Sequence, residues 1–172
     1  MAPLAMLCEA ASVDPKAFRD ALASVCTPVS VVTSHQDGRP HGTTVSAFCS
    51  LSLDPPMVLV SLDRSSDLLG IVTESRVFGI NVLNAGQKDL ALNFARKGAD
   101  KFEGVEWELH QGVPRIAGVA TWLVCKLQQL HEGGDHLVAF GLVEHAESAP
   151  GNPLLYRYRE FGTLAGTGEG EL

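Results

Sequence analysis

Residues 41–56 read HGTTVSAFCSLSLDPP. The part over residues 43–50 is rich in β-branched and hydroxyl side chains and contains no Gly or Pro, which is typical of a β-strand. The Asp54-Pro55-Pro56 end cannot continue a strand pairing, because proline has no N–H to donate. The stretch therefore predicts one continuous strand that ends in a sharp turn.

Hydroxyl groups are dense along this predicted strand. They belong to Thr43, Thr44, Ser46, Ser50 and Ser52. A hydroxyl group both donates and accepts hydrogen bonds, so such a row suits a flat heteroaromatic ligand with alternating donors and acceptors. The alternative is an ordinary strand with a polar outer face.

The other predicted elements surround this strand. Asp14 and Pro15 are a typical helix start, and the helix should end near residues 27–28. Its stripe of Phe18, Leu22 and Val25 is expected to pack into the core. Strands are expected at 29–34, 57–62, 77–83, 105–110, 120–130, 136–147 and 154–158, helices at 67–73 and 87–94, and a hairpin turn at 37–38. No G-x-G-x-x-G occurs, so a closed or split Greek-key barrel fits best.

Two polar features have both a functional and a structural interpretation. One arginine and two serine hydroxyls precede a predicted helix N-terminus: Arg64, Ser65 and Ser66. Together with the helix N-terminus, these groups favour phosphate binding. The alternative is a plainly capped helix with a solvated arginine. Asn81 lies among apolar strand residues. Its amide offers a donor and an acceptor to a ligand, or it is a satisfied structural amide.

Three stretches carry a resemblance to one family. They are the G-x-T-V-S-x-F-x-S-L-S-x-D-P-P pattern over 42–56, the FGINVL segment at 78–83 and the GGDH segment at 133–136. In this order and spacing they resemble the short-chain flavin reductases. The resemblance implies a mainly β fold, a split β-barrel (Greek-key-like) with two or three short helices. It also implies one flavin reductase-like domain over 14–162, an N-terminal tail over 1–13 and a flexible C-terminal tail over 163–172.

The resemblance implies an NAD(P)H:flavin oxidoreductase, in which hydride passes from NADH or NADPH to FMN or FAD. It implies a homodimer that supplies diffusible reduced flavin to a partner monooxygenase. No catalytic side chain is expected, since the flavin carries the chemistry. The implied flavin-binding residues are Thr43, Thr44, Val45, Ser46, Ala47, Ser52, Ser61, Arg64, Ser66, Asn81, Lys101 and Phe102, and the implied nicotinamide-binding residues are Gly134, Asp135 and His136.

Alternatives to this activity stay open at this point. One is a non-catalytic flavin- or haem-binding split-barrel protein that acts as a carrier or sensor. Another is an oxidase that keeps its flavin tightly. The segment around Lys101 and Phe102 can likewise be a loop anchored by aromatic residues rather than a cover over the flavin.

Composition narrows the class of protein. The net charge is −7, from 20 acidic and 13 basic residues, and no Lys/Arg cluster stands out, which argues against nucleic-acid binding. Four cysteines and six histidines lack metal-ligand spacing, so free thiols and no structural metal are expected. No signal peptide or membrane-spanning run is recognised. We expect a cytoplasmic protein.

Overall fold

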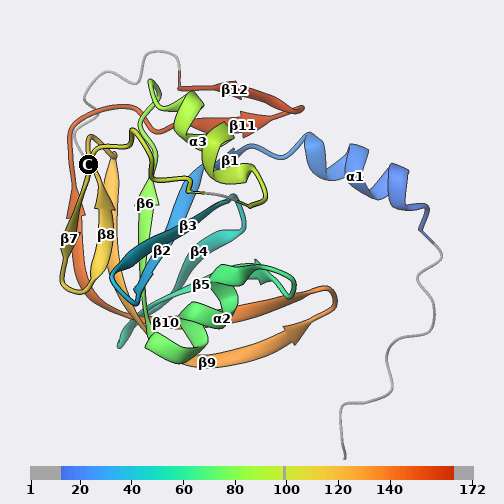
Figure 1. Ribbon diagram of the computed structural model, residues 1–172. Helices are drawn as coiled ribbons and strands as arrows, with labels where there is room; N and C mark the ends of the chain where they lie inside the picture. Colours follow the sequence, from blue (N-terminus) through green and yellow to red (C-terminus); the bar gives the residue numbers. More distant parts are fainter. Residues whose placement is uncertain (1–12, 99, 165–172) are drawn as a thin grey trace, which may run out of the picture.

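The computed structural model describes residues 13–98 and 100–164 (Figure 1). This part of the chain forms three helices and twelve strands. In chain order they are α1 Pro15–Ala23, β1 Thr27–Pro28, β2 Ser30–Gln36, β3 Arg39–Val45, β4 Phe48–Leu53, β5 Pro56–Asp63, α2 Asp67–Ser75, β6 Val77–Val82, α3 Lys88–Ala95, β7 Trp107–His110, β8 Val113–Ile116, β9 Thr121–Gly133, β10 His136–Ser148, β11 Leu155–Arg157 and β12 Glu160–Gly162.

Seven strands form the main sheet, in the order β3-β2-β6-β9-β10-β5-β4. Its two edge strands, β3 and β4, follow each other in the chain and are separated only by Ser46 and Ala47. Three residue steps span at most about 10 Å, so the sheet has to curl until its edges meet. The N–H of Ser61 on β5 donates to the carbonyl oxygen of Ala47 at 2.9 Å. This bond continues the register in which Phe48 pairs with Val60, so the chain has already joined β5 at Ala47. We call the crossing between the two edges, at Ser46 and Ala47, the seam; the curled sheet is the split barrel that the sequence predicted.

The prediction of one continuous strand over 43–50 is therefore wrong. Val45 on the edge strand β3 still pairs with β2, whereas Phe48 on the opposite edge strand β4 already pairs with β5. The chain leaves one edge and joins the other within two residues, and this break puts Ser46 and Ala47 outside both strands. The hydroxyl-rich stretch is thus a crossing point of the barrel rather than a uniform strand face.

Two apolar cores lie on opposite faces of the sheet. Successive strand residues point to opposite faces, so Val32 belongs to the core that packs under α2, and Val31 belongs to the core under α3 and the β7–β8 hairpin. Phe78 and Trp122 are among the largest fully buried side chains of the two cores. Val45 and Leu62, which lie on the two sides of the seam, both belong to the core under α2.

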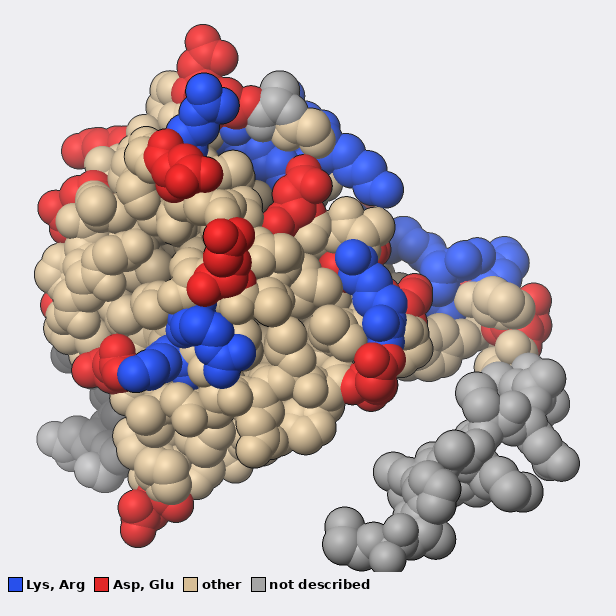
Figure 2. Space-filling view, turned by 60° about the horizontal axis from the view of Figure 1, so that its bottom comes forward, with Lys and Arg blue, Asp and Glu red and all other residues tan. Residues whose placement is uncertain are grey.

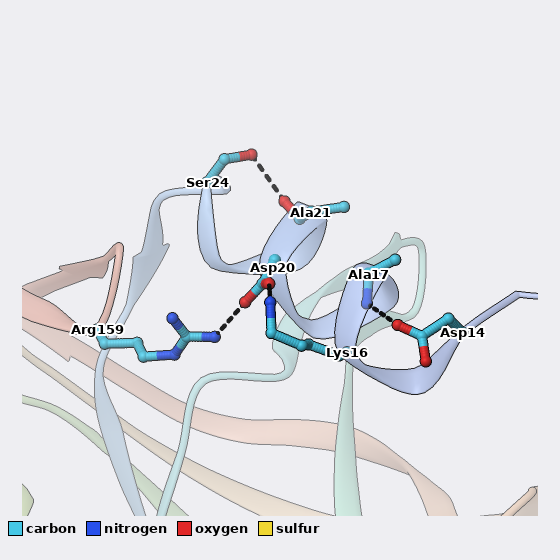
Figure 3. Close-up of polar contacts among 7 residues, drawn as sticks. All are labelled: Asp14, Lys16, Ala17, Asp20, Ala21, Ser24 and Arg159. Carbon is cyan, nitrogen blue, oxygen red and sulfur yellow. Dashed lines mark hydrogen bonds and ion pairs between the residues drawn. The ribbon is translucent and has the colours of Figure 1, made fainter.

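Several local predictions agree with the structure. Asp14 is the N-cap of α1, and its carboxylate accepts from the N–H of Ala17 at 2.8 Å (Figure 3). Asp37 and Gly38 form the β2–β3 turn with positive φ angles of 51° and 76°, as expected for a tight hairpin. Ser66 is the N-cap of α2, and Gly134 lies in the β9–β10 turn with a φ of 72°.

The prediction that the stripe of α1 packs into the core is wrong. Phe18, Leu22 and Val25 are 58%, 53% and 51% exposed, and α1 buries none of its residues. The helix projects from the barrel (Figure 1). An ion pair of 2.6 Å joins Asp20 to Arg159 beyond β11 (Figure 3). Helical periodicity identifies an apolar face but not the surface that covers it.

Two further expectations concern the tails of the chain and membrane-spanning segments. The predicted tails over 1–13 and 163–172 lie largely outside the described residues, of which only 13, 163 and 164 belong to them. Among the described residues, no helix is both long and apolar enough to cross a membrane.

Candidate functional site

A hollow of about 210 Å³ opens at the seam. We call it the seam hollow. The end of β3 and the crossing residues form one wall, the end of β5 forms the other, and the start of β10 closes it. Its lining residues are Thr43, Thr44, Val45, Ser46, Ala47, Ser61, Leu62, Asp63, Ser66 and His136. The structure thus brings together eight of the fifteen residues that the resemblance implied.

The hydroxyl row does not present all its groups to the hollow in the same way. Thr44 donates its hydroxyl to the carbonyl oxygen of Ala91 in α3, at 2.6 Å. Val45 is buried, whereas Ser46 and Ala47 are exposed. The crossing at residues 46–47 therefore offers its side chain and backbone to a ligand, while Thr44 also holds α3 against β3.

A second, larger hollow of about 610 Å³ adjoins the first at Ser66. We call it the helix hollow, because residues of α2 and the loop before it make up most of its wall. Its lining residues are Gln36, Arg64, Ser65, Ser66, Asp67, Leu69, Gly70, Ile71 and Glu74. Ser66 makes no side-chain capping bond to α2, so its hydroxyl is available to a ligand in either hollow.

The side chain of Arg64, predicted to contact a phosphate, is bonded to other residues of the protein. Its Nε donates to the carbonyl oxygen of Gly134 at 2.8 Å, and its guanidinium forms an ion pair with Glu132. Its backbone N–H donates to the carbonyl oxygen of Asp135 at 3.1 Å. Arg64 lines the helix hollow, but its charge is matched by Glu132. Its main observed role is to hold the β9–β10 turn against the loop before α2.

The β9–β10 turn brings its histidine to the seam. His136 pairs across the sheet with Asp63 at the end of β5, and both line the seam hollow. Nδ1 of His136 lies 2.7 Å from a carboxylate oxygen of Asp135, so the ring orientation is fixed by its neighbour. Hydrogen bonds from Ser65 lower the pKa of Asp63, which keeps this carboxylate charged beside the histidine. Gly134 and Asp135 do not line the hollow.

Asn81 has a structural role in place of the cofactor contact that the sequence predicted. It is fully buried, and its amide nitrogen lies 3.2 Å from both the carbonyl oxygen of Val31 and the hydroxyl of Thr33. Its amide oxygen accepts from the N–H of Ile116 at 2.8 Å. Asn81 therefore ties β6 to β2 and β8, and its polar atoms are already used by the fold.

Three more residues lie away from the seam hollow. Ser52 pairs with Met57 near the far end of β5, about 13 Å along that strand from Ser61 at the usual strand rise. Phe102 is 6% exposed and packs edge-on against Phe94, so it is a core residue. Lys101 donates to the carbonyl oxygens of Gly42 and Phe94 at 3.2 and 3.0 Å. Burial lowers the pKa of Lys101.

Other lining residues were not predicted. Leu62 and Asp63 follow Ser61 in β5 and line the seam hollow, and Gln36 and Glu74 are hydrogen-bonded to each other at 2.6 Å beside the helix hollow. Their sequence context is an apolar strand end and a helix surface, which gives no signal of a site. Only the pairing of β5 with β10 brings Asp63 opposite His136.

The surface charge agrees with the composition. Figure 2 shows a mostly uncharged face on which acidic and basic side chains occur as small mixed groups. Burial lowers the pKa of His41, so this β3 histidine adds little positive charge at neutral pH. On this face there is no continuous basic patch for a nucleic acid.

Comparison with known proteins identifies the family. The family model described as "Flavin reductase like domain" matches residues 22–165. The chain belongs to the flavin reductase family. A "Probable flavin reductase" of Rhizobium meliloti (strain 1021) is 43% identical over 145 residues, which cover 83% of this flavin reductase and 47% of the relative. The chain thus spans about half the length of that relative.

Two further relatives match over most of their length. The "Flavin-dependent monooxygenase, reductase subunit HsaB" of Mycobacterium tuberculosis (strain ATCC 25618 / H37Rv) is 37% identical over 150 residues, covering 85% of this chain and 80% of that protein. The solved structure of the Streptomyces globisporus C-1027 NADH:FAD oxidoreductase SgcE6, in complex with NAD and FAD fragments, is 34% identical with a TM-score of 0.86, covering 91% and 98%. The predictions of the family, the split-barrel fold and an NAD(P)H:flavin oxidoreductase are confirmed.

Proposed function

We propose that the seam hollow binds the ring system of a flavin and that His136 presents the nicotinamide nucleotide to it. One observation carries this proposal. Residues 43–47 and His136 are about ninety positions apart in the sequence, yet they line one hollow. Hydride transfer needs the two ring systems in contact, so the two implied binding regions have to be neighbours.

The residues at the seam fit a flavin ring. Its polar edge alternates donors and acceptors, and the hydroxyls of Thr43, Ser46 and Ser61 can do both. The volume of about 210 Å³ is below the 300–1,000 Å³ usual for a whole ligand. We therefore assign only the ring to the seam hollow. The ribityl and phosphate part extends past Ser66 into the helix hollow, toward the N-terminus of α2.

The chain's contribution to the reaction is binding and orientation. A bound flavin supplies the hydride-accepting chemistry. Residues 46 and 47 lie outside the strands, so their backbone N–H groups, with the Ser46 hydroxyl, can stabilise the negative charge that develops on the ring. Asp135 fixes Nδ1 of His136 and leaves the other ring nitrogen for the nucleotide. No proton transfer by a side chain is required.

We also propose that the reduced flavin is released to a separate monooxygenase. HsaB is named a reductase subunit of such an enzyme, and the crossing residues Ser46 and Ala47 are exposed, which favours exchange of the ligand. A cytoplasmic location is part of this proposal. The described cysteines, Cys26, Cys49 and Cys125, are free thiols, as is usual in a reducing compartment.

A homodimer completes the proposal. Phe18 and Leu22 on α1, with Val25 just after the helix, form an exposed apolar stripe. This stripe is a surface that a second copy would cover. Light scattering after gel filtration should give twice the chain mass of 18.3 kDa. The Phe18→Ser/Leu22→Ser double variant should shift toward the single-chain mass, and Lys16→Ala on the polar face of α1 should not. An unshifted double variant excludes this helix from the contact.

The test of the function is a direct assay. Purified protein is mixed with FMN or FAD and with NADH or NADPH, and the nicotinamide absorbance is followed for all four combinations. Ser46→Ala should raise the flavin dissociation constant in the combination that turns over fastest. No oxidation above background in any combination would exclude the reductase and favour a carrier or sensor. Flavin that stays bound through gel filtration would favour an oxidase instead.

A further inference from the structure

A cluster of metal-binding residue types lies outside both hollows. His110 ends β7, and His145 and Glu147 lie two positions apart on β10, so the last two side chains share one face of the strand. One ring nitrogen of each histidine and one carboxylate oxygen of Glu147 lie within 4.8 Å of one another. None of the three lines the seam hollow or the helix hollow.

His110 has an unused buried nitrogen. Among the described residues only its Nε2 and the Nε1 of Trp122 are buried side-chain polar atoms without a hydrogen-bond partner. A buried polar atom without a partner destabilises the folded state. The ring of His110 lies 5.4 Å from the ring of His145, centroid to centroid. A ligand between the two rings would satisfy this nitrogen.

The carboxylate of the cluster is already oriented. Oε1 of Glu147 lies 2.7 Å from Nε2 of His145, and Oε2 lies 2.6 Å from Nη2 of Arg115 on β8. Arg115 also lies 3.8 Å from Glu108, so two carboxylates surround one guanidinium. Carboxylates that bind metal ions are commonly held in this way by a hydrogen bond to their second oxygen. The guanidinium fixes Glu147 and leaves Oε1 directed at the histidines.

We propose that His110, His145 and Glu147 form a binding site for a divalent transition-metal ion, with Zn²⁺ as the best match. Two imidazole nitrogens and one carboxylate oxygen are typical zinc ligands, at about 2.0–2.2 Å from the ion. Ligands at that distance in a tetrahedron are about 3.4 Å apart. To reach this spacing, the His145–Glu147 pair at 2.7 Å would open and the wider separations, of up to 4.8 Å, would close. A fourth position remains for water.

The site would be structural rather than part of flavin reduction. A bound ion would connect the β7–β8 hairpin to β10, which belong to different sheets. This proposal departs from the sequence-based expectation of no structural metal, which rested on spacing along the chain. The ligands at 110, 145 and 147 are brought together by the hairpin and not by a local motif.

The test uses untagged, EDTA-treated protein and Zn²⁺ as the probe. Isothermal titration should show one strong site per chain, and Zn²⁺ should raise the thermal midpoint as expected for a ligand that binds the folded state. His110→Ala and His145→Gln should each weaken binding at least tenfold and abolish the thermal shift. His131→Ala, at an exposed histidine of β9, is the matched control and should bind like the wild type.

Two further readouts keep the result unambiguous. In wild-type protein, Zn²⁺ should shift the ring resonances of His110 and His145 and leave those of His131 in place, which requires no variant to fold. NADH oxidation with flavin should be unchanged in His110→Ala. Absence of a stoichiometric site, equal binding by His110→Ala, or ring shifts confined to other histidines would each overturn the proposal.

Discussion

The hydroxyl of Thr44 donates to the carbonyl oxygen of Ala91 across the β3–α3 contact, at 2.6 Å. The next hydroxyl in the row, on Ser46, lies in the exposed crossing between β3 and β4. Two residues with the same predicted role thus have different surroundings. Thr44 serves both the fold and the hollow, whereas Ser46 faces the hollow from the surface.

Variants at these two positions should separate stability from flavin binding. Thr44→Val removes this donor from the Ala91 carbonyl oxygen, so we expect a loss of about 0.5–1.5 kcal/mol in the free energy of unfolding, as for one neutral hydrogen bond. Ser46→Ala should change stability by less than about 0.5 kcal/mol and should weaken flavin binding about two- to tenfold, as for one neutral hydrogen bond. Urea unfolding and flavin fluorescence titration measure the two effects. Unchanged flavin affinity in Ser46→Ala would remove this side chain from the site.

Gly79 on β6 allows close packing of the large indole of Trp122. A Cβ atom at Gly79 would lie 2.5 Å from the Trp122 ring and 2.8 Å from the Thr33 hydroxyl. Gly79→Ala should therefore destabilise the protein by about 1–3 kcal/mol. Gly70→Ala is the control, because that helical glycine is exposed and has nothing within 4 Å of an added Cβ. It should be neutral or stabilising by up to about 1 kcal/mol in urea unfolding.

The sequence predicted local features well where one residue type decides the geometry. The turn at Asp37 and Gly38 and the helix starts at Asp14 and Ser66 are found where expected. Each depends on backbone conformation or capping within three residues. The break at Ser46 and Ala47 could not be predicted in this way, because the residues on either side both favour strands and only barrel closure separates them.

Only part of the candidate site could be predicted, because sequence motifs report local features and not the contacts between distant segments. The residues of the seam came from a continuous motif, and His136 came from a second motif. Asn81 was misassigned because an amide within an apolar strand looks alike whether it binds a ligand or other strands. Its partner Ile116 lies 35 positions away. The cluster of His110 and His145 has an equally large separation and no local signal.

Cys125 should be chemically inert in the folded protein. Burial raises the pKa of its thiol to about 12, so at pH 8 only about one molecule in ten thousand carries the reactive thiolate. The thiolate fraction rises tenfold for each pH unit until the pH reaches that pKa. Thiol-reagent kinetics should show the same number of fast-reacting groups in wild type and Cys125→Ala. Cys49→Ser, at an exposed cysteine, should lose one fast group. Loss of a fast group in Cys125→Ala would contradict this burial.

His136 is expected to affect the nicotinamide more than the flavin. Its ring lines the seam hollow and is oriented by Asp135. His136→Ala should raise the KM for NADH or slow hydride transfer about tenfold or more, since positioning affects rate steeply, with flavin affinity within twofold of wild type. His131→Ala, on the neighbouring strand, should behave like the wild type in stopped-flow assays. If His136→Ala instead loses flavin and keeps its nicotinamide kinetics, His136 belongs to the flavin site.

Arg64 holds the turn that carries His136. The side chain donates to Gly134 and pairs with Glu132, and its backbone N–H donates to Asp135. Because the guanidinium is already paired, it is a poor partner for a flavin phosphate. Its removal should loosen the turn and leave the phosphate contact to Ser66 and the N-terminus of α2.

Arg64→Ala should therefore raise the KM for NADH several-fold, while the affinities for FMN and for riboflavin change by less than about twofold. The effect on unfolding should be no more than about 1 kcal/mol, since the ion pair with Glu132 is exposed to solvent. Arg64→Lys keeps the charge but lacks the planar fork that binds two partners at once. Its KM for NADH should therefore lie between the KM of the wild type and that of Arg64→Ala. The decisive comparison is FMN against riboflavin, which has no phosphate. A loss confined to FMN would show that Arg64 contacts the phosphate after all.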